Sequence, residues 1–254
     1  MLNIVTHNKL FHADEVSAIA LLSIFVDADV EVERVEHNSS SFEKYDMVVD
    51  ISRQFDGVKF FDHHQYRGGK SSAGLIWEYI GLEKKYPSIS QLIKIVDEQD
   101  VGIKKAGDFE FPNLIRVYNH LDVDSQEQEG QFEKALEFAK SIFSSLKIKD
   151  EEIVKAKEIV TNSFLFDANP SILELETFTP YWGSYINSQA TPNVKLVVWE
   201  DKRDGSYKVR VVTNKRKQIM LKEDANMEFV HSAGFFAVAK DEEMMQEYLR
   251  KIKL

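Results

Sequence analysis

The chain has 254 residues, of which 43% are hydrophobic and 29% are charged, and a formal net charge of −10 at pH 7. No apolar run approaches the roughly 20 residues that a membrane span requires, so we expect a globular protein outside the membrane. The absence of cysteine excludes disulfides, zinc-thiolate sites, iron–sulfur clusters and cysteine nucleophiles. Any bound metal would need His and carboxylate ligands.

The acidic balance argues against a broadly basic surface that holds long nucleic acid. Nucleotides are not excluded, because two divalent cations in one site would carry four positive charges locally.

Short apolar segments alternate with helical patterns in the first part of the chain. Strands are predicted at 2–6, 30–35, 47–51 and 58–61. Helices are predicted at 15–25, which is apolar on almost all sides, and at 73–85, 88–101 and 126–164. This alternation predicts an α/β fold with a doubly wound, mostly parallel sheet that helices cover on both faces.

A change of architecture is predicted after the long helix, where Asn169-Pro170 precedes a strand-like segment at 172–178. Asp204-Gly205 lies between two further strand patterns and predicts a β-hairpin. A strand at 235–239 and a helix at 241–251 end the chain. We therefore expect two domains, at 1–165 and 166–254, the second a smaller α+β domain.

Ionisable residues gather where the predicted strands end. The clusters are His7, His12, Asp14 and Glu15 after the first strand, Asp50 after the third, Asp62, His63 and His64 after the fourth, and Asp97 and Asp100 on one helical face. Open parallel sheets bind ligands outside the carboxyl ends of their strands, so we expect these clusters to converge on one crevice.

Imidazole and carboxylate ligands together suit Mn²⁺, Zn²⁺, Co²⁺ or Fe²⁺, and a carboxylate such as Asp50 can bridge two ions. Metals held roughly 3.5–4 Å apart activate a bridging water for in-line attack on phosphorus. A single Asp at a strand end is more often a turn or helix cap. An adjacent His-His pair preceded by Asp is hard to explain as packing, because burying these groups unpaired would cost several kcal/mol. The sequence therefore predicts a two-metal phosphoester hydrolase. His37 and His120 stand alone among polar residues and are predicted to be surface histidines.

Six segments together resemble a known family: THNKLFHADE, VVDIS, DHHQ, SSAGLIWEYIG, IVDEQD and FVHSAGFFA. They are similar to the DHH phosphoesterase superfamily, and more closely to its melanocyte-proliferating-gene (Myg-type) branch of metal-dependent exonucleases. The resemblance implies a DHH-type catalytic domain at 1–165 that binds two Mn²⁺ or Mg²⁺ ions. It also implies a C-terminal domain at 166–254 that closes over short single-stranded RNA or DNA, degraded from 3′ to 5′.

The resemblance assigns roles residue by residue. The implied metal ligands are His7, His12, Asp14, Asp50 as the bridging carboxylate, His63, and either Asp97, which we favour, or Asp100. Asp62 would orient His63, and His64 would face the phosphate. The superfamily's usual first motif is His-x-x-x-Asp-x-Asp, whereas four residues here separate His7 from His12-Ala13-Asp14. This departure leaves the choice between Mn²⁺, which we favour, and Mg²⁺ open.

Further candidate residues concern the substrate. His231, Ser232 and Gly234 lie in a small-residue segment where backbone can approach a ligand. Ser71 and Ser72 begin a predicted helix whose N-terminus suits an anion.

Two alternative functions would use the same residues. One is a hydrolase of a small substrate such as pyrophosphate or a short oligonucleotide. The other is a non-catalytic metal or nucleotide sensor. The N-terminus shows no export signal, so we expect a cytoplasmic location. The oligomeric state stays open.

Overall fold

The computed structural model describes residues 1–39, 41–65, 68–166, 169–188, 193–216, 218–252 and 254. The chain divides into two compact units, Met1–Asp150 and Glu151–Leu254. Each unit has its own sheet and its own core. The division falls inside helix α5 (Glu127–Asn162), whereas the sequence suggested a boundary after residue 165. Helical periodicity continues through the division, so the sequence carries no signal there.

The first unit contains a four-stranded parallel sheet in the order β2-β1-β3-β4. Its strands are β1 (Leu2–His7), β2 (Val30–Val35), β3 (Met47–Val49) and β4 (Phe60–Phe61). The predicted α/β class and the parallel sheet are confirmed. The strand order reverses between β1 and β3, so the loops after these two strands leave in opposite directions and open a crevice at their carboxyl ends.

Four shorter helices accompany this sheet: α1 (Ala13–Phe25), α2 (Ser72–Ile80), α3 (Pro87–Asp100) and α4 (Phe111–Arg116). The first ten residues of α1 are all buried, which explains why its apolar residues lie on every side. Its first turn carries Asp14 and Glu15, whose negative charge the helix dipole favours at that end.

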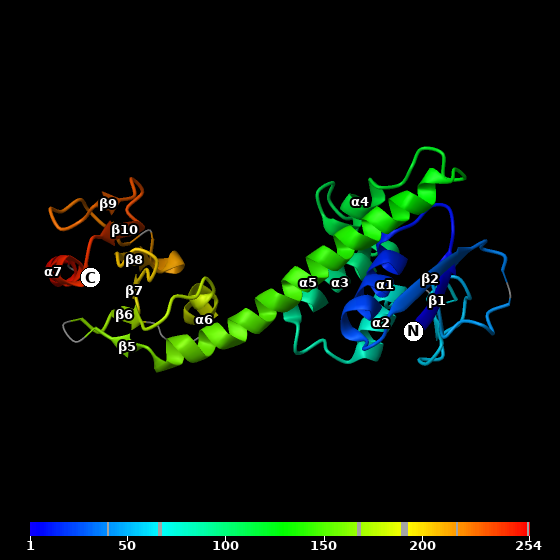
Figure 1. The fold of residues 1–254 in the computed structure, drawn as a ribbon, viewed down its shortest axis with the longest axis horizontal. Coiled ribbons are helices and arrows are strands. Elements are labelled where there is room, and N and C mark those ends of the chain that lie inside the picture. The colour runs from blue at the N-terminus through cyan, green and yellow to red at the C-terminus, as the bar shows by residue number, and fades with distance from the viewer. Residues whose placement is uncertain (40, 66–67, 167–168, 189–192, 217, 253) are drawn as a thin grey trace. The chain divides into compact units, whose positions relative to one another are not determined.

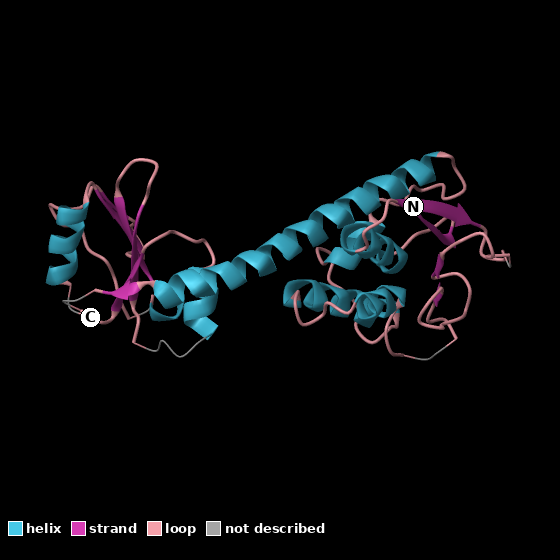
Figure 2. Ribbon diagram, turned by 60° about the horizontal axis from the view of Figure 1, so that its bottom comes forward, coloured by secondary structure: helices cyan, strands magenta, loops and turns pink. Residues whose placement is uncertain are grey.

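The helices lie on one face of the sheet rather than on both. Figure 1 shows α1, α2 and α3 on the same side of β1 and β2, and Figure 2 shows the helices of this unit on one side of its strands. Ile4 and Val49 share one core with residues of these three helices. Val48 on the opposite face packs against Phe42 and Tyr45, which belong to the connection between β2 and β3. A doubly wound sheet needs crossover helices on both faces, and no helix is described between β2 and β4. The doubly wound prediction is therefore corrected to a parallel sheet with helices on one face.

The second unit contains a mixed six-stranded sheet in the order β5-β6-β7-β8-β10-β9. Its strands are β5 (Phe164–Leu165), β6 (Ile172–Leu175), β7 (Leu196–Glu200), β8 (Tyr207–Val211), β9 (Phe229–Val230) and β10 (Phe236–Ala239). Among the described strand pairs of this sheet, β6 and β7 are parallel and the others are antiparallel. The predicted hairpin is confirmed, because β7 and β8 are antiparallel and Gly205 between them has a φ of +72°.

Helices cover both faces of this second sheet. Helix α7 (Glu242–Lys251) packs Met245 and Leu249 into one core, and α6 (Trp182–Ser188) packs Trp182 and Ile186 into the other. None of the helices in the described part of the chain combines the length and the apolar character needed to cross a bilayer.

Candidate metal centre

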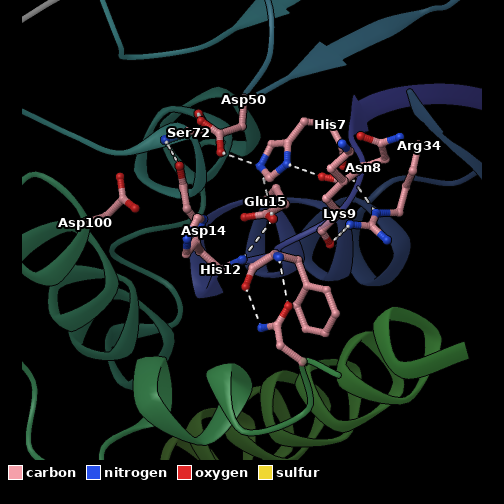
Figure 3. Close-up of polar contacts among 12 residues, drawn as sticks. His7, Asn8, Lys9, His12, Asp14, Glu15, Arg34, Asp50, Ser72 and Asp100 are labelled. Carbon is pink, nitrogen blue, oxygen red and sulfur yellow. Dashed lines mark hydrogen bonds and ion pairs between the residues drawn. The ribbon is translucent and has the colours of Figure 1, made fainter. Parts of the chain in front are cut away.

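The predicted clusters meet at the carboxyl ends of β1 and β3. Three groups form there, in each of which the ligand atoms lie within 4.8 Å of one another. The groups are His7, His12 and Glu15; Asp50, His63 and His64; and Asp14, His63 and Asp100. Figure 3 shows how β1, the start of α1 and the segment after β3 direct several of these side chains toward one region.

His7 is the last residue of β1 and only 2% of it is exposed. Burial lowers the pKa of its imidazole to about 4, so the ring is neutral at pH 7. Its Nδ1 lies 3.1 Å from the carbonyl oxygen of Asn8, and a proton donated there leaves a lone pair on Nε2. This Nε2 lies 3.2 Å from Glu15 Oε1 and 3.5 Å from Asp50 Oδ2. A lone pair that faces two carboxylates can bind a cation between them, or accept a proton from one of them.

Glu15 belongs to the first predicted cluster, but the sequence assigned it no ligand role. Its side chain is fully buried, and Oε1 accepts a hydrogen bond of 2.9 Å from the backbone N–H of His12. Oε2 is buried without a hydrogen-bond partner among the described residues. Burial, with the charge of Asp14, raises the pKa of this carboxyl well above its usual value. Glu15 also completes a capping box with His12 at the start of α1.

Asp50 occupies the centre of the site. Its backbone has a φ of +57°, a left-handed conformation that is uncommon for a residue other than glycine. Oδ1 lies 3.4 Å from His64 Nδ1 and 3.6 Å from His63 Nε2, whereas Oδ2 faces His7. Burial and then the charges of Asp14 and Glu15 raise the pKa of Asp50 well above its usual value. The two oxygens of one carboxylate thus face different histidines, as in a bridging ligand.

Three carboxylates converge on His63. Its Nε2 lies 2.8 Å from Asp100 Oδ2, 3.4 Å from Asp14 Oδ2 and 3.6 Å from Asp50 Oδ1. Burial alone would lower the pKa of this imidazole, but Asp100 and Asp14 raise it to about 10. Without a metal, a proton on His63 therefore supplies the positive charge that the surrounding carboxylates require.

Asp62 contacts His64 rather than His63, which corrects the expected partner. Its Oδ1 lies 2.9 Å from His64 Nδ1 and accepts the backbone N–H of the same residue at 2.9 Å. Oδ2 accepts the backbone N–H of Arg53 at 2.7 Å. Burial opposes ionisation of Asp62, but these hydrogen bonds lower its pKa to about 2. Contact with Asp62 in turn raises the pKa of His64, which is half exposed.

The start of α2 holds two further carboxylates in place. Asp14 accepts the backbone N–H groups of Ser72 at 3.0 Å and Ala73 at 2.5 Å. Asp97 accepts the backbone N–H of Ser71 at 3.0 Å and its hydroxyl at 2.8 Å. The anions at this helix N-terminus are therefore the protein's own carboxylates. Asp97 lies outside the three ligand groups, whereas Asp100 belongs to one of them.

The donor set fits divalent cations. Imidazole and carboxylate are the ligands that Mn²⁺ and similar metals accept, and the site holds an unpartnered buried oxygen on Glu15. Ligands about 2.1 Å from a shared ion lie roughly 3 Å apart, close to the separations around His7, Asp50 and His63. The acidic and histidine clusters can therefore bind metal.

Two cavities adjoin this site. One, of about 500 Å³, is lined by ligand candidates and also by Gln99, Asn113 and Arg116. The other, of about 380 Å³, reaches Asp50, Asp62 and His64 from a second direction.

The two surface histidines differ in their surroundings. His37 is exposed, as expected, but its ring stacks on that of His7 at 4.4 Å and an interplanar angle of 16°, and it lines both cavities. No sequence signal revealed this, because the contact depends on the loop after β2. His120 instead pairs with Glu127 at 3.0 Å, away from the site.

His231, Ser232 and Gly234 lie in the turn between β9 and β10 of the second unit. The backbone N–H of Ala233 donates to His231 Nδ1 at 3.0 Å, and Ser232 is exposed. Gly234 has a φ of +62°, and a Cβ there would overlap the Met220 side chain and lie 3.0 Å from the backbone oxygen of Leu221. Packing within this unit thus explains the glycine without a ligand.

The sequence matches the family MYG1_exonuc, described as "Uncharacterised protein family (UPF0160)", over residues 3–225. A relative called MYG1 protein in Chlamydia muridarum is 34% identical over 155 residues, which cover 57% of this chain and 53% of the relative. The MYG1 protein of Saccharomyces cerevisiae is 26% identical over 326 residues, covering 99% of this chain and 95% of the relative.

A human relative, named MYG1 exonuclease, is 29% identical over 149 residues, covering 52% of this chain and 38% of the relative. The matched chain spans about half the length of the chlamydial relatives. The family match includes every ligand candidate from His7 to Asp100. On this match, the chain belongs to the MYG1_exonuc family.

Proposed function

We propose that this protein is a metal-dependent phosphodiesterase that acts as a 3′-to-5′ exonuclease on short single-stranded RNA or DNA. The observation that carries the proposal is the position of Asp50, whose two carboxylate oxygens face histidines of different ligand groups. A bridging carboxylate of this kind is typical of two-metal phosphoesterases. Family membership and the name of the human relative support the nuclease class.

Two divalent cations, with Mn²⁺ favoured over Mg²⁺, would share Asp50. One would be held by His7, His12 and Glu15, and the other by His63, Asp14 and Asp100. When bound, such ions polarise a phosphoryl oxygen and lower the pKa of a water nucleophile. We assign Asp97, Ser71 and Ser72 to positioning, because their hydrogen bonds tie the start of α2 to the ligand carboxylates.

His64 and Asp62 would serve the reaction directly. Asp62 holds His64 Nδ1 and raises the pKa of the imidazole, which favours the doubly protonated ring. In that form Nε2 would present a proton to the cavities. This proton would stabilise charge on the phosphate and neutralise the leaving oxygen.

Residues 1–165 would form the catalytic domain and residues 166–254 the substrate-binding domain. The second domain would bind the substrate through His231 and Ser232. A cytoplasmic location stays a prediction.

A small-substrate hydrolase is the second candidate. The net charge of −10 and a main cavity of about 500 Å³ favour a compact substrate such as pyrophosphate. Hydrolysis of single-stranded RNA, single-stranded DNA, dinucleotides and pyrophosphate, measured side by side with Mn²⁺, tests both functions. We expect the oligonucleotides to be degraded fastest. Hydrolysis of pyrophosphate alone would favour the second candidate, and no hydrolysis of any substrate would indicate a metal or nucleotide sensor.

A further inference from the structure

The two cavities of the first unit meet at the candidate metal centre. Both are lined by His37, Asp50 and His64. A ligand that extends from one cavity into the other must therefore pass the bridging carboxylate.

The walls of the two cavities differ in character. The larger cavity has apolar surfaces from Leu10, Val96 and Pro112, which suit the flat faces of a base and the carbons of a sugar. The smaller cavity has Asn38, Ser39 and Ser52, whose short polar side chains suit a hydrated backbone.

Each cavity also contains one arginine with a free guanidinium. Arg116 in the last turn of α4 lines the larger cavity, and Arg53 beyond β3 lines the smaller. Both are exposed, and neither side chain makes an ion pair or hydrogen bond within the described residues. Carboxylates line the same cavities, yet none of them pairs with either arginine. A guanidinium that is left free beside carboxylates is available to an anion, and its planar fork matches a phosphate.

We propose that the two cavities are adjacent nucleotide subsites on either side of the scissile phosphate. The larger takes the terminal nucleoside, and Arg116 binds a non-bridging oxygen of the scissile phosphate. The smaller takes the next nucleotide, and Arg53 binds the phosphate beyond it. This assignment rests on the proposed function, since it names how the same site holds its substrate.

Substrates of different length distinguish the proposed roles of Arg53 and Arg116. A nucleoside 5′-p-nitrophenyl phosphate has only the scissile phosphate, whereas a thymidine trinucleotide also has the next one. Arg53→Ala should therefore raise KM for the trinucleotide at least about 10-fold, the usual effect of losing a charge-assisted hydrogen bond, and leave KM for the ester unchanged. Arg116→Ala should raise KM for both substrates.

Salt dependence supplies a readout that a structural role would not change. Each phosphate contact in single-stranded nucleic acid contributes about 0.7 to the slope of log affinity against log salt concentration. Arg53→Ala should flatten this slope by about that amount for the trinucleotide. Arg53→Lys and Arg116→Lys should recover part of the lost affinity, because a point charge replaces the fork.

The experiment compares these four variants with Lys84→Ala, an exposed cation that lines neither cavity. Metal content and thermal stability are measured for each variant, and both should match those of the wild type. Suppose that the wild type hydrolyses both substrates while Arg53→Ala changes KM for the two equally, or changes neither KM. That result would contradict the proposed subsites and leave the proposed function intact. If the wild type hydrolyses neither substrate with Mn²⁺, the proposed function fails and the subsites fail with it.

Discussion

Two buried carboxylates in the candidate metal centre reduce the stability of the metal-free fold. Asp50 and Glu15 are buried carboxylates whose pKa values are raised well above the usual range, so their charged forms destabilise the metal-free fold. A bound cation would remove this penalty, and its binding free energy would then contribute to folding.

Replacing Asp50 with Asn tests this balance. Asn keeps the shape of the side chain and tolerates the left-handed backbone, but it removes the buried charge. We expect Asp50→Asn to stabilise the metal-free protein by about 1 kcal/mol or more at pH 8, where an acid of raised pKa is most destabilising. The metal-dependent rate should fall on the order of 100-fold or more.

Urea unfolding in chelator and hydrolysis with Mn²⁺ measure the two effects of Asp50→Asn. Asp27→Asn, at an exposed site, should change neither. A near-wild-type rate for Asp50→Asn would contradict the assignment of Asp50 as the bridging ligand.

The adjacent histidines should separate metal binding from turnover. His63 Nε2 lies among three carboxylates, so His63→Ala should raise the Mn²⁺ concentration needed for half-maximal activity. His64 is half exposed and held by Asp62, so His64→Ala should lower kcat and leave metal content near that of the wild type. Metal analysis and Mn²⁺ titrations of both variants provide the comparison, and equal metal loss in both would reject the distinction.

The sequence revealed most of these residues because the motif places them at strand ends. It misassigned the partner of Asp62, gave Glu15 no ligand role and did not place His37 at the site, since these contacts depend on turns whose side-chain directions no spacing rule predicts. The sequence favoured Asp97 over Asp100 as a ligand without deciding between them, because both lie on the same helical face. The structure instead places Asp100 in a ligand group and Asp97 against Ser71.

At the scale of elements, the start of α2 positions the site. Its N-terminal amides bind Asp14, and the Ser72 hydroxyl donates to Asp50 at 3.1 Å. Gly74 in the first turn lets Asp97 approach this helix, because a Cβ at position 74 would overlap the Asp97 carboxylate.

Gly74→Ala should therefore destabilise the protein by about 1–3 kcal/mol, because the Asp97 carboxylate must move and its hydrogen bonds to Ser71 weaken. Gly130→Ala in α5 is the matched control, since a Cβ there meets open space and alanine favours a helix by about 0.5–1 kcal/mol. Urea unfolding of the two variants should give changes of opposite sign. A stabilising Gly74→Ala would show that the contact with Asp97 does not constrain α2.

Periodicity predicted the longer elements well, including β2 and the long helix α5. Helices α4 and α6 were missed because six or seven residues carry too little pattern. The face of the sheet that lacks helices was also missed. Phe42 and Tyr45 cover that face from an irregular connection, and an irregular segment shows no periodicity.

At the scale of the whole molecule, the ligand groups found among the described residues all lie in the first unit, between His7 and Asp100. The predicted ligands come from distant parts of the sequence, so one compact parallel sheet must fold before they meet. Metal binding should accordingly stabilise this unit, because the unfolded chain lacks the assembled site.

The most direct test is metal analysis combined with activity on one preparation. Protein stripped with a chelator should be inactive on a single-stranded oligonucleotide. Mn²⁺ should restore activity as about two ions bind per chain, and Ca²⁺ should restore much less because it activates water poorly. Full activity of the stripped protein in excess chelator would contradict the metal-dependent mechanism, and saturation of activity at one ion per chain would contradict the bridging role of Asp50.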